Sequence, residues 1–169
     1  MNNATHDHFL SVRRVLVGAI AATALLGAGL VGLAPGSGAA AHKPAVVKVK
    51  LIEYKIKLKP STVTLKAASA GKVKMVAANK GSMEHEMVVV RADSVEALPL
   101  DADGVVVEDQ IPEADFMGEI GEYKQGRTKS KVFTLTPGTY VVFCNIDVDY
   151  GGTIINHFKQ DMHAVLTVK

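Results

Sequence analysis

Short stretches of alternating apolar and polar residues are the feature of this sequence that most restricts its fold. Alternation with a period of two is typical of a β-strand with one buried face. Turn residues separate the stretches, as at Ala70-Gly71, Lys80-Gly81-Ser82 and Pro137-Gly138. The stretches are residues 46–59, 62–65, 72–79, 85–91, 132–135, 139–144 and 164–168. Short strands at this spacing, with no long helical pattern, predict an all-β protein with a β-sandwich fold.

The first stretch changes its parity partway along. Its apolar positions are odd-numbered up to Leu51 and even-numbered from Ile52 onward. A slip of one residue turns every later side chain to the other face of a strand. We therefore expect residues 46–59 to form one strand with a bulge or kink near Leu51-Ile52.

Residues 85–91 place His85 on the same face as Met87 and Val89, and the turn Lys80-Gly81-Ser82 precedes them. We therefore expect His85 at the start of a strand, at the rim of a sheet. Residues 92–130 differ from the rest of the chain, because they are acidic and have only scattered apolar positions, with a short helix predicted over 93–98. A connection of this length usually has structure or a function of its own. We interpret residues 92–130 as an irregular, partly helical excursion packed against the sandwich.

Residues 1–41 have the composition of an export signal. Arg13-Arg14 precede an uncharged run from Val15 to Ala34, and the segment ends in Ala39-Ala40-Ala41. A positive start, an apolar run and an A-x-A end predict cleavage after Ala41. The alternative is an uncleaved membrane anchor, since about 20 apolar residues can span a bilayer. We therefore expect a signal segment, residues 1–41, and a domain, residues 42–169, exported to the periplasm or the extracellular space.

The charges of the domain are segregated along the chain. Residues 42–80 contain ten lysines and a single acid, Glu53, whereas residues 84–122 contain twelve acids and a single base, Arg91. If folding keeps these groups apart, the surface has a dipole that orients a charged partner. The alternative is two well-solvated faces. The formal net charge of the chain is only +2, which gives no reason to expect nucleic acid as a partner.

The segment from Thr139 to His163 carries the most informative chemistry. It contains the only cysteine of the chain, Cys144, then a turn at Gly151-Gly152, then His157 and Met162. Soft sulfur ligands select copper, and two His, one Cys and a weak axial Met form a blue electron-transfer site. His85 is the second imidazole that such a site requires. Each residue also has an ordinary interpretation, since a lone buried Cys is often inert and Met is often part of a core.

The sequence resembles the cupredoxin family of blue copper proteins. The resemblance rests on residues 79–86, on Leu135-Thr136-Pro137-Gly138-Thr139-Tyr140 leading to Cys144, and on His157 and Met162 before a closing strand. It implies a Greek-key β-sandwich, one type 1 copper held by those four side chains, and one-electron transfer. It also implies that His157 lies near the surface as the electron exit. Redox partner proteins would then dock near His157 and the 146–156 loop.

Two departures from the family pattern affect this interpretation. Twelve residues separate Cys144 from His157, where familiar members have only a few, and Asp161 precedes Met162 where many relatives have Gly. We interpret the long loop as a lid or docking surface that bulges outward. The alternative is that His157 does not reach the metal, in which case His163 is the spare imidazole.

Two asparagines, Asn79 and Asn145, are candidates for supporting the ligands, because an amide beside the thiolate or between two ligand loops fixes their geometry. A Cu(I)-trafficking or storage protein is the alternative function. Its soft cluster would be Met83, His85, Met87, Met162 and His163. We do not expect an enzyme: the domain has too few histidines for a further multi-copper cluster, and no catalytic triad or carboxylate pair stands out.

Overall fold

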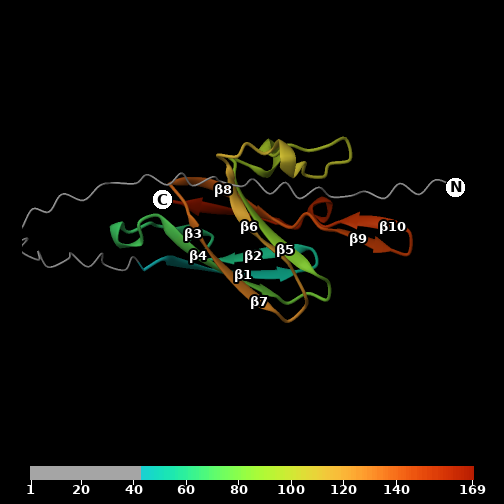
Figure 1. Cartoon of the computed structure of the whole chain (residues 1–169), viewed down its shortest axis with the longest axis horizontal. Coiled ribbons are helices and arrows are strands. Elements are labelled where there is room, and N and C mark those ends of the chain that lie inside the picture. Colours follow the sequence, from blue (N-terminus) through green and yellow to red (C-terminus); the bar gives the residue numbers. More distant parts are fainter. Residues whose placement is uncertain (1–42) are drawn as a thin grey trace, which may run out of the picture. The chain divides into compact units, whose positions relative to one another are not determined.

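The structure is a computed structural model, and it describes residues 43–169 (Figure 1). The predicted signal segment, residues 1–41, lies outside the described residues. The strands are β1 (Ala45–Ile52), β2 (Lys55–Lys59), β3 (Thr62–Val63), β4 (Lys72–Asn79), β5 (His85–Arg91), β6 (Phe116–Tyr123), β7 (Thr128–Thr134), β8 (Gly138–Phe143), β9 (Asp147–Tyr150), β10 (Thr153–Asn156) and β11 (His163–Val168). Over the part of the chain that is described, no helix is long and apolar enough to cross a bilayer.

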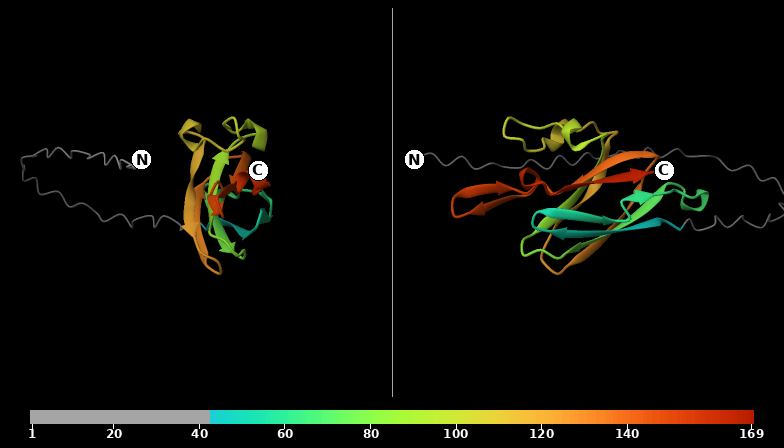
Figure 2. Two further views of the ribbon diagram at one scale, coloured as in Figure 1. Left: turned by 90° about the vertical axis from the view of Figure 1, so that its right-hand side faces the viewer. Right: turned by 180° about the vertical axis from the view of Figure 1, so that it is seen from behind.

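All strands except β9 and β10 form two sheets that pack face to face, as the β-sandwich prediction required (Figure 2). One sheet has the order β2-β1-β4-β7 and the other the order β3-β11-β8-β5-β6. The inward side chains of both sheets form one continuous core. In β4, for example, Val73, Met75 and Ala77 lie on one face of the strand and are all fully buried. The sandwich prediction is therefore confirmed.

The expectation of one kinked strand over residues 46–59 is wrong. The chain reverses direction at Glu53-Tyr54, so that β1 and β2 are antiparallel neighbours with Ile52 opposite Lys55. A two-residue hairpin turn changes the parity of the buried positions as a bulge would, because the chain re-enters the sheet on a new strand. The turn lies at the end of the sandwich where β5 begins (Figure 1).

The irregular excursion is shorter than the sequence indicated. Residues 92–115 are irregular, with 3-10 turns at Val95–Ala97 and Glu108–Gln110, but residues 116–123 form strand β6. Two register shifts along the pairing of β5 with β6 disturb the alternation, which explains why this strand was missed. Leu98, Val106 and Ile111 of the excursion form a second apolar cluster with the outer face of β5 and β8. Strand β5 is therefore buried on both faces.

Strands β9 and β10 form a separate two-stranded hairpin that projects from the sandwich (Figures 1 and 2). Its turn is Gly151-Gly152, as the sequence indicated, and both glycines have positive φ, 62° and 91°. A turn of this kind between two strands needs residues without a Cβ penalty at positive φ. The long segment after Cys144 is therefore an ordered hairpin.

Candidate metal centre

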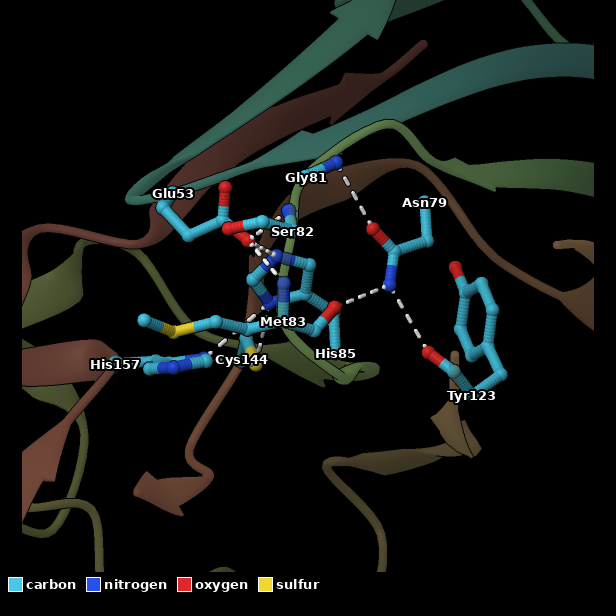
Figure 3. A network of polar contacts seen from close by, with 9 residues as sticks. All are labelled: Glu53, Asn79, Gly81, Ser82, Met83, His85, Tyr123, Cys144 and His157. Atoms are coloured by element: carbon cyan, nitrogen blue, oxygen red, sulfur yellow. Dashed lines mark hydrogen bonds and ion pairs between the residues drawn. The ribbon is translucent and has the colours of Figure 1, made fainter. Parts of the chain in front are cut away.

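Three potential ligands converge at one end of the sandwich. His85 comes from the start of β5, Cys144 follows β8, and His157 follows β10. Cys144 Sγ lies 3.3 Å from His157 Nδ1 and 3.8 Å from His85 Nδ1, and the two Nδ1 atoms are 3.3 Å apart. All three side chains have an exposed fraction of 0%. They point toward one another (Figure 3). The result is a buried triangle of one sulfur and two nitrogen donors.

The size of this triangle fits a single metal ion. Metal–nitrogen and metal–sulfur bonds of about 2.0 and 2.3 Å in a trigonal plane place the donors about 3.5–3.7 Å from one another. The three observed separations lie around that range. One thiolate and two imidazoles form a donor set that suits copper, since soft ligands favour it. The residues present therefore match the metal that the sequence implied.

The surroundings of the two imidazoles keep them in the neutral form that binds a metal ion. Burial and, to a smaller extent, the neighbouring His85 lower the pKa of His157 to about 4. Burial lowers the pKa of His85 as well, although Glu53 opposes this effect. Both rings are therefore neutral at pH 7, and protons do not compete for their donor atoms. By contrast, burial raises the pKa of the Cys144 thiol to about 12, so a bound metal ion must displace its proton.

The hairpin explains how His157 reaches the site despite the long insertion. Its base is closed by the pairing of Asp147 with Asn156 and by a bond of 2.9 Å from His157 N–H to the Ile146 carbonyl. The amide of Asn156 also donates to the Asn145 carbonyl and to Asp147 Oδ1, both at 2.9 Å. Ile146 and His157 are therefore neighbours in space, and the ten residues between them loop outward and return.

His163 lies apart from this cluster. Its Nε2 is 3.8 Å from Asp161 Oδ1, and its ring packs against Phe158 at 5.4 Å between centroids. Phe158 belongs to the apolar cluster on the outer face of the second sheet, whereas Met162 belongs to the core between the sheets. Adjacent residues at the start of β11 thus point in opposite directions. His157, and not His163, joins His85 and Cys144.

His157, which we expected near the surface, has a side chain that is completely covered. The ring of Tyr54 packs edge-on against it, with 5.2 Å between the centroids. Its Nε2 is buried and has no hydrogen-bond partner within the described residues. Nδ1 faces the other two ligands. The outer side of His157 is therefore closed by the partly buried Tyr54.

Met162 is held close to the cluster through its backbone. Its N–H donates to the His157 carbonyl at 3.2 Å, and its carbonyl accepts from Cys144 N–H at 3.1 Å. The side chain is fully buried in the same core cluster as Cys144. Asp161 immediately before it adopts a left-handed conformation, with φ of 63°. This is the position where the sequence departs from glycine.

The two asparagines support the backbone around the ligands. Asn79 donates to the carbonyls of Met83 and Tyr123 at 2.8 and 3.0 Å, and its Oδ1 accepts from Gly81 N–H at 3.0 Å. These bonds shape the loop that precedes His85 (Figure 3). The backbone N–H of Asn145 donates to Glu86 Oε1 at 2.8 Å. Neither asparagine forms a side-chain hydrogen bond to a ligand atom.

Sequence reasoning missed Glu53, which contacts a ligand directly. Its Oε1 lies 3.2 Å from His85 Nε2, and it accepts hydrogen bonds from Ser82 N–H and Met83 N–H at 2.6 and 2.7 Å. Burial alone would raise the pKa of Glu53, but the N–H groups and His85 outweigh it and lower the pKa. The available signal was that Glu53 is the single acid among ten lysines of residues 42–80.

The solved structures that are similar to this chain include those of three proteins. Auracyanin from the photosynthetic bacterium Roseiflexus castenholzii, solved after reduction with sodium dithionite, has 18% identity and a TM-score of 0.50, covering 74% of this chain and 97% of auracyanin. Rusticyanin from Thiobacillus ferrooxidans has 14% identity and a TM-score of 0.48, covering 73% and 76% of the two chains. Auracyanin A from Chloroflexus aurantiacus, a "blue" copper protein, has 16% identity and a TM-score of 0.45, covering 75% and 100%.

Neither protein-family models nor curated protein sequences match the chain. The match to the Roseiflexus auracyanin extends over nearly the whole of that protein and over 74% of this chain. The chain therefore has the Greek-key β-sandwich of the cupredoxin fold.

Proposed function

We propose that this protein is an exported one-electron carrier with a single type 1 copper held by His85, Cys144 and His157, with Met162 as the weak axial ligand. The observation that carries the proposal is the buried triangle of Cys144 Sγ and two histidine Nδ1 atoms, 3.3–3.8 Å apart. Copper bound there would supply one-electron chemistry, because a Cys and two His with a weak axial Met are typical of blue electron-transfer sites.

In this function the polypeptide would hold the three donor atoms rigidly and exclude water from them. All three donor side chains are fully buried, and two of them are anchored in or directly after sheet strands. His157 is fixed by the closed base of the β9–β10 hairpin. Donors that are already in place before the metal binds need not rearrange when its charge changes, which is what fast electron transfer requires. Loose loops would not meet this requirement.

A redox partner protein would dock at the end of the molecule that carries the site. The β9–β10 hairpin leads into His157, and its residues Tyr150 and Ile154 are each 61% exposed. Exposed apolar and aromatic side chains beside a redox site suit a transient protein contact. Tyr54 covers His157, and we propose that electrons leave by this side of the imidazole.

The surface charges would orient the encounter. Lysines lie directly opposite one another on the outer face of the first sheet, with Lys48 facing Lys59 and Lys50 facing Lys57. Like charges opposed in this way destabilise a sheet slightly, and none of the lysines among residues 43–169 forms an ion pair. The acidic excursion lies on the other sheet. This arrangement favours the surface dipole that the sequence suggested.

Export is the remaining part of the proposal. It rests on the signal-like residues 1–41 and on the burial of the single cysteine, which protects the thiol in an oxidising compartment. Sequencing the N-terminus of the protein purified from the periplasm of a bacterial host tests it. A mature chain beginning at His42 is the expected result, and retention of residues 1–41 in the membrane fraction would indicate an anchor.

Titration of the purified protein with Cu(II) tests the copper site. We expect one equivalent to produce an intense blue colour, which Cys144→Ser abolishes because the thiolate is lost. A colourless site that prefers Cu(I) and does not depend on Cys144 would contradict the electron carrier and support copper trafficking. Absence of stoichiometric copper binding would reject both functions.

A further inference from the structure

We propose that Glu53 is the positioning residue of the centre: it fixes the proton of His85 on Nε2, directs Nδ1 to the metal position and lowers the reduction potential. The part concerning the potential rests on the proposed copper function. The part concerning the proton does not, because it concerns His85 in the metal-free protein.

The hydrogen bonds of Glu53 determine the state of the His85 ring. A single oxygen, Oε1, faces three N–H positions: Ser82 N at 2.6 Å, Met83 N at 2.7 Å and His85 Nε2 at 3.2 Å (Figure 3). An ionised carboxylate only accepts hydrogen bonds, so Nε2 must carry the proton. In a neutral imidazole the other nitrogen then has a free lone pair. That nitrogen is Nδ1, which faces Cys144 Sγ at 3.8 Å.

A second, independent observation is the close approach of this carboxylate to Gly81. A Cβ placed on Gly81 would come within 2.6 Å of the Glu53 carboxyl carbon. Positive φ does not explain this glycine, since Gly81 is absent from the positive-φ glycines of residues 43–169. A side chain at position 81 would therefore displace the Glu53 carboxylate from its present place. Two separate stretches of the sequence are thus adapted to one carboxylate.

Glu53 also lies in a turn whose two residues contact the two imidazoles of the site. It occupies the two-residue turn between β1 and β2, next to Tyr54, whose ring packs against His157. One turn therefore contacts both imidazoles, each from its outer side. Among the described residues Glu53 pairs with no lysine, although lysines surround it in sequence, and its only side-chain partner is the His85 imidazole. A surface acid in this stretch would be expected to pair with a lysine.

The carboxylate would favour the more highly charged state of a bound ion. A hydrogen bond from the outer imidazole nitrogen to a carboxylate makes the inner nitrogen a better donor, and loss of such a partner typically lowers metal affinity about 10- to 100-fold. A tenfold loss of Cu(II) affinity at constant Cu(I) affinity raises a one-electron potential by about 59 mV. Removal of the Glu53 charge should therefore raise the potential.

The experiment uses two variants that disturb the same contact differently. Glu53→Gln removes the charge and keeps the shape, whereas Gly81→Ala keeps the charge and displaces the carboxylate. Glu84→Gln is the matched control, since Glu84 is an exposed acid in the same loop. The first measurement is the imidazole ¹⁵N spectrum of the metal-free proteins. The second is the reduction potential and Cu(II) affinity of the copper-loaded proteins.

We expect the metal-free wild type and Glu84→Gln to carry the His85 proton on Nε2, and both test variants to show a mixture of tautomers. We expect both test variants, and not the control, to lose Cu(II) affinity at least tenfold and to gain potential. A wild-type proton on Nδ1, or a potential unchanged in Glu53→Gln, would overturn the inference. The wild-type spectrum decides the proton position even if a variant does not fold. If no blue site forms, the copper function fails while the tautomer result still decides the role of Glu53.

Discussion

Replacement of Glu86 by Gln should stabilise the metal-free protein at neutral and alkaline pH. The Glu86 carboxylate is partly buried and accepts a hydrogen bond from Asn145 N–H at 2.8 Å. Burial, with smaller contributions from nearby Glu108, Glu119 and Glu122, raises its pKa to about 7 against the effect of that hydrogen bond. Ionisation of Glu86 therefore acts against the fold. Gln keeps an oxygen that accepts the same hydrogen bond but has no charge.

The magnitude and the sign follow from proton linkage. The pKa of Glu86 is 4.5 in the unfolded chain and about 7 in the folded protein. Between these pH values Glu86 keeps its proton in the folded protein and loses it in the unfolded chain. Folding then loses stability as the pH rises, by about 1.4 kcal/mol for each pH unit. Over this window the loss approaches about 3 kcal/mol and is constant at higher pH. Below pH 4.5 both states are protonated and the contribution vanishes.

Urea unfolding of the metal-free proteins in the presence of a chelator measures this effect. The free energy of unfolding of Glu86→Gln minus that of wild type should rise from near zero at pH 4.5 to about 3 kcal/mol at pH 8. The difference removes the contributions of His85 and His157, whose lowered pKa values affect both proteins equally. A difference that does not vary with pH would refute the reasoning.

Three further predictions concern the ligand loop and its surroundings. Met162→Leu should retain the blue colour and raise the reduction potential, because a weak donor to Cu(II) is lost; an unchanged potential would exclude Met162 as a ligand. Deletion of Asp149, Tyr150, Thr153 and Ile154 joins Gly151-Gly152 directly to the pair Val148–Ile155 and leaves the hairpin base intact. Copper affinity should be unchanged in that protein, and a loss measured by competitive titration would show that the outer hairpin positions His157. At Asp161, where φ is 63°, thermal unfolding should find Gly more stable than Ala by about 1 kcal/mol, since Ala alone bears the Cβ penalty; equal stability would contradict the left-handed backbone.

The local pattern of apolar and polar residues was sufficient to predict much of the fold. Strand β4 was predictable because it begins with alternating polar and apolar residues, Lys72 to Met75, and β5 because an apolar run, Met87 to Val90, follows a turn. Strand β6 was missed because register shifts interrupt its pairing with β5 and because Gly118 and Gly121 lie within it. A period of two is readable only where a strand is regular and has one wet face.

The chemistry of the site was also readable from residue types. The order of a His at a strand start, then a Cys, a His and a Met near the closing strand, already named His85, Cys144 and His157 before any geometry was known. Residue type limits which metals a side chain can bind, and this holds wherever the side chain lies. The sequence by itself therefore determined the kind of site and the class of fold.

Only the tertiary structure decided how the long insertion and the first turn contribute. The hairpin base brings Ile146 beside His157, and the β1–β2 turn places Glu53 on His85 and Tyr54 on His157. These contacts join residues that lie far apart in the chain, for instance Glu53 and His85 or Tyr54 and His157. These contacts cannot be predicted from local propensity, because they depend on the register of strand pairing and on how the two sheets pack.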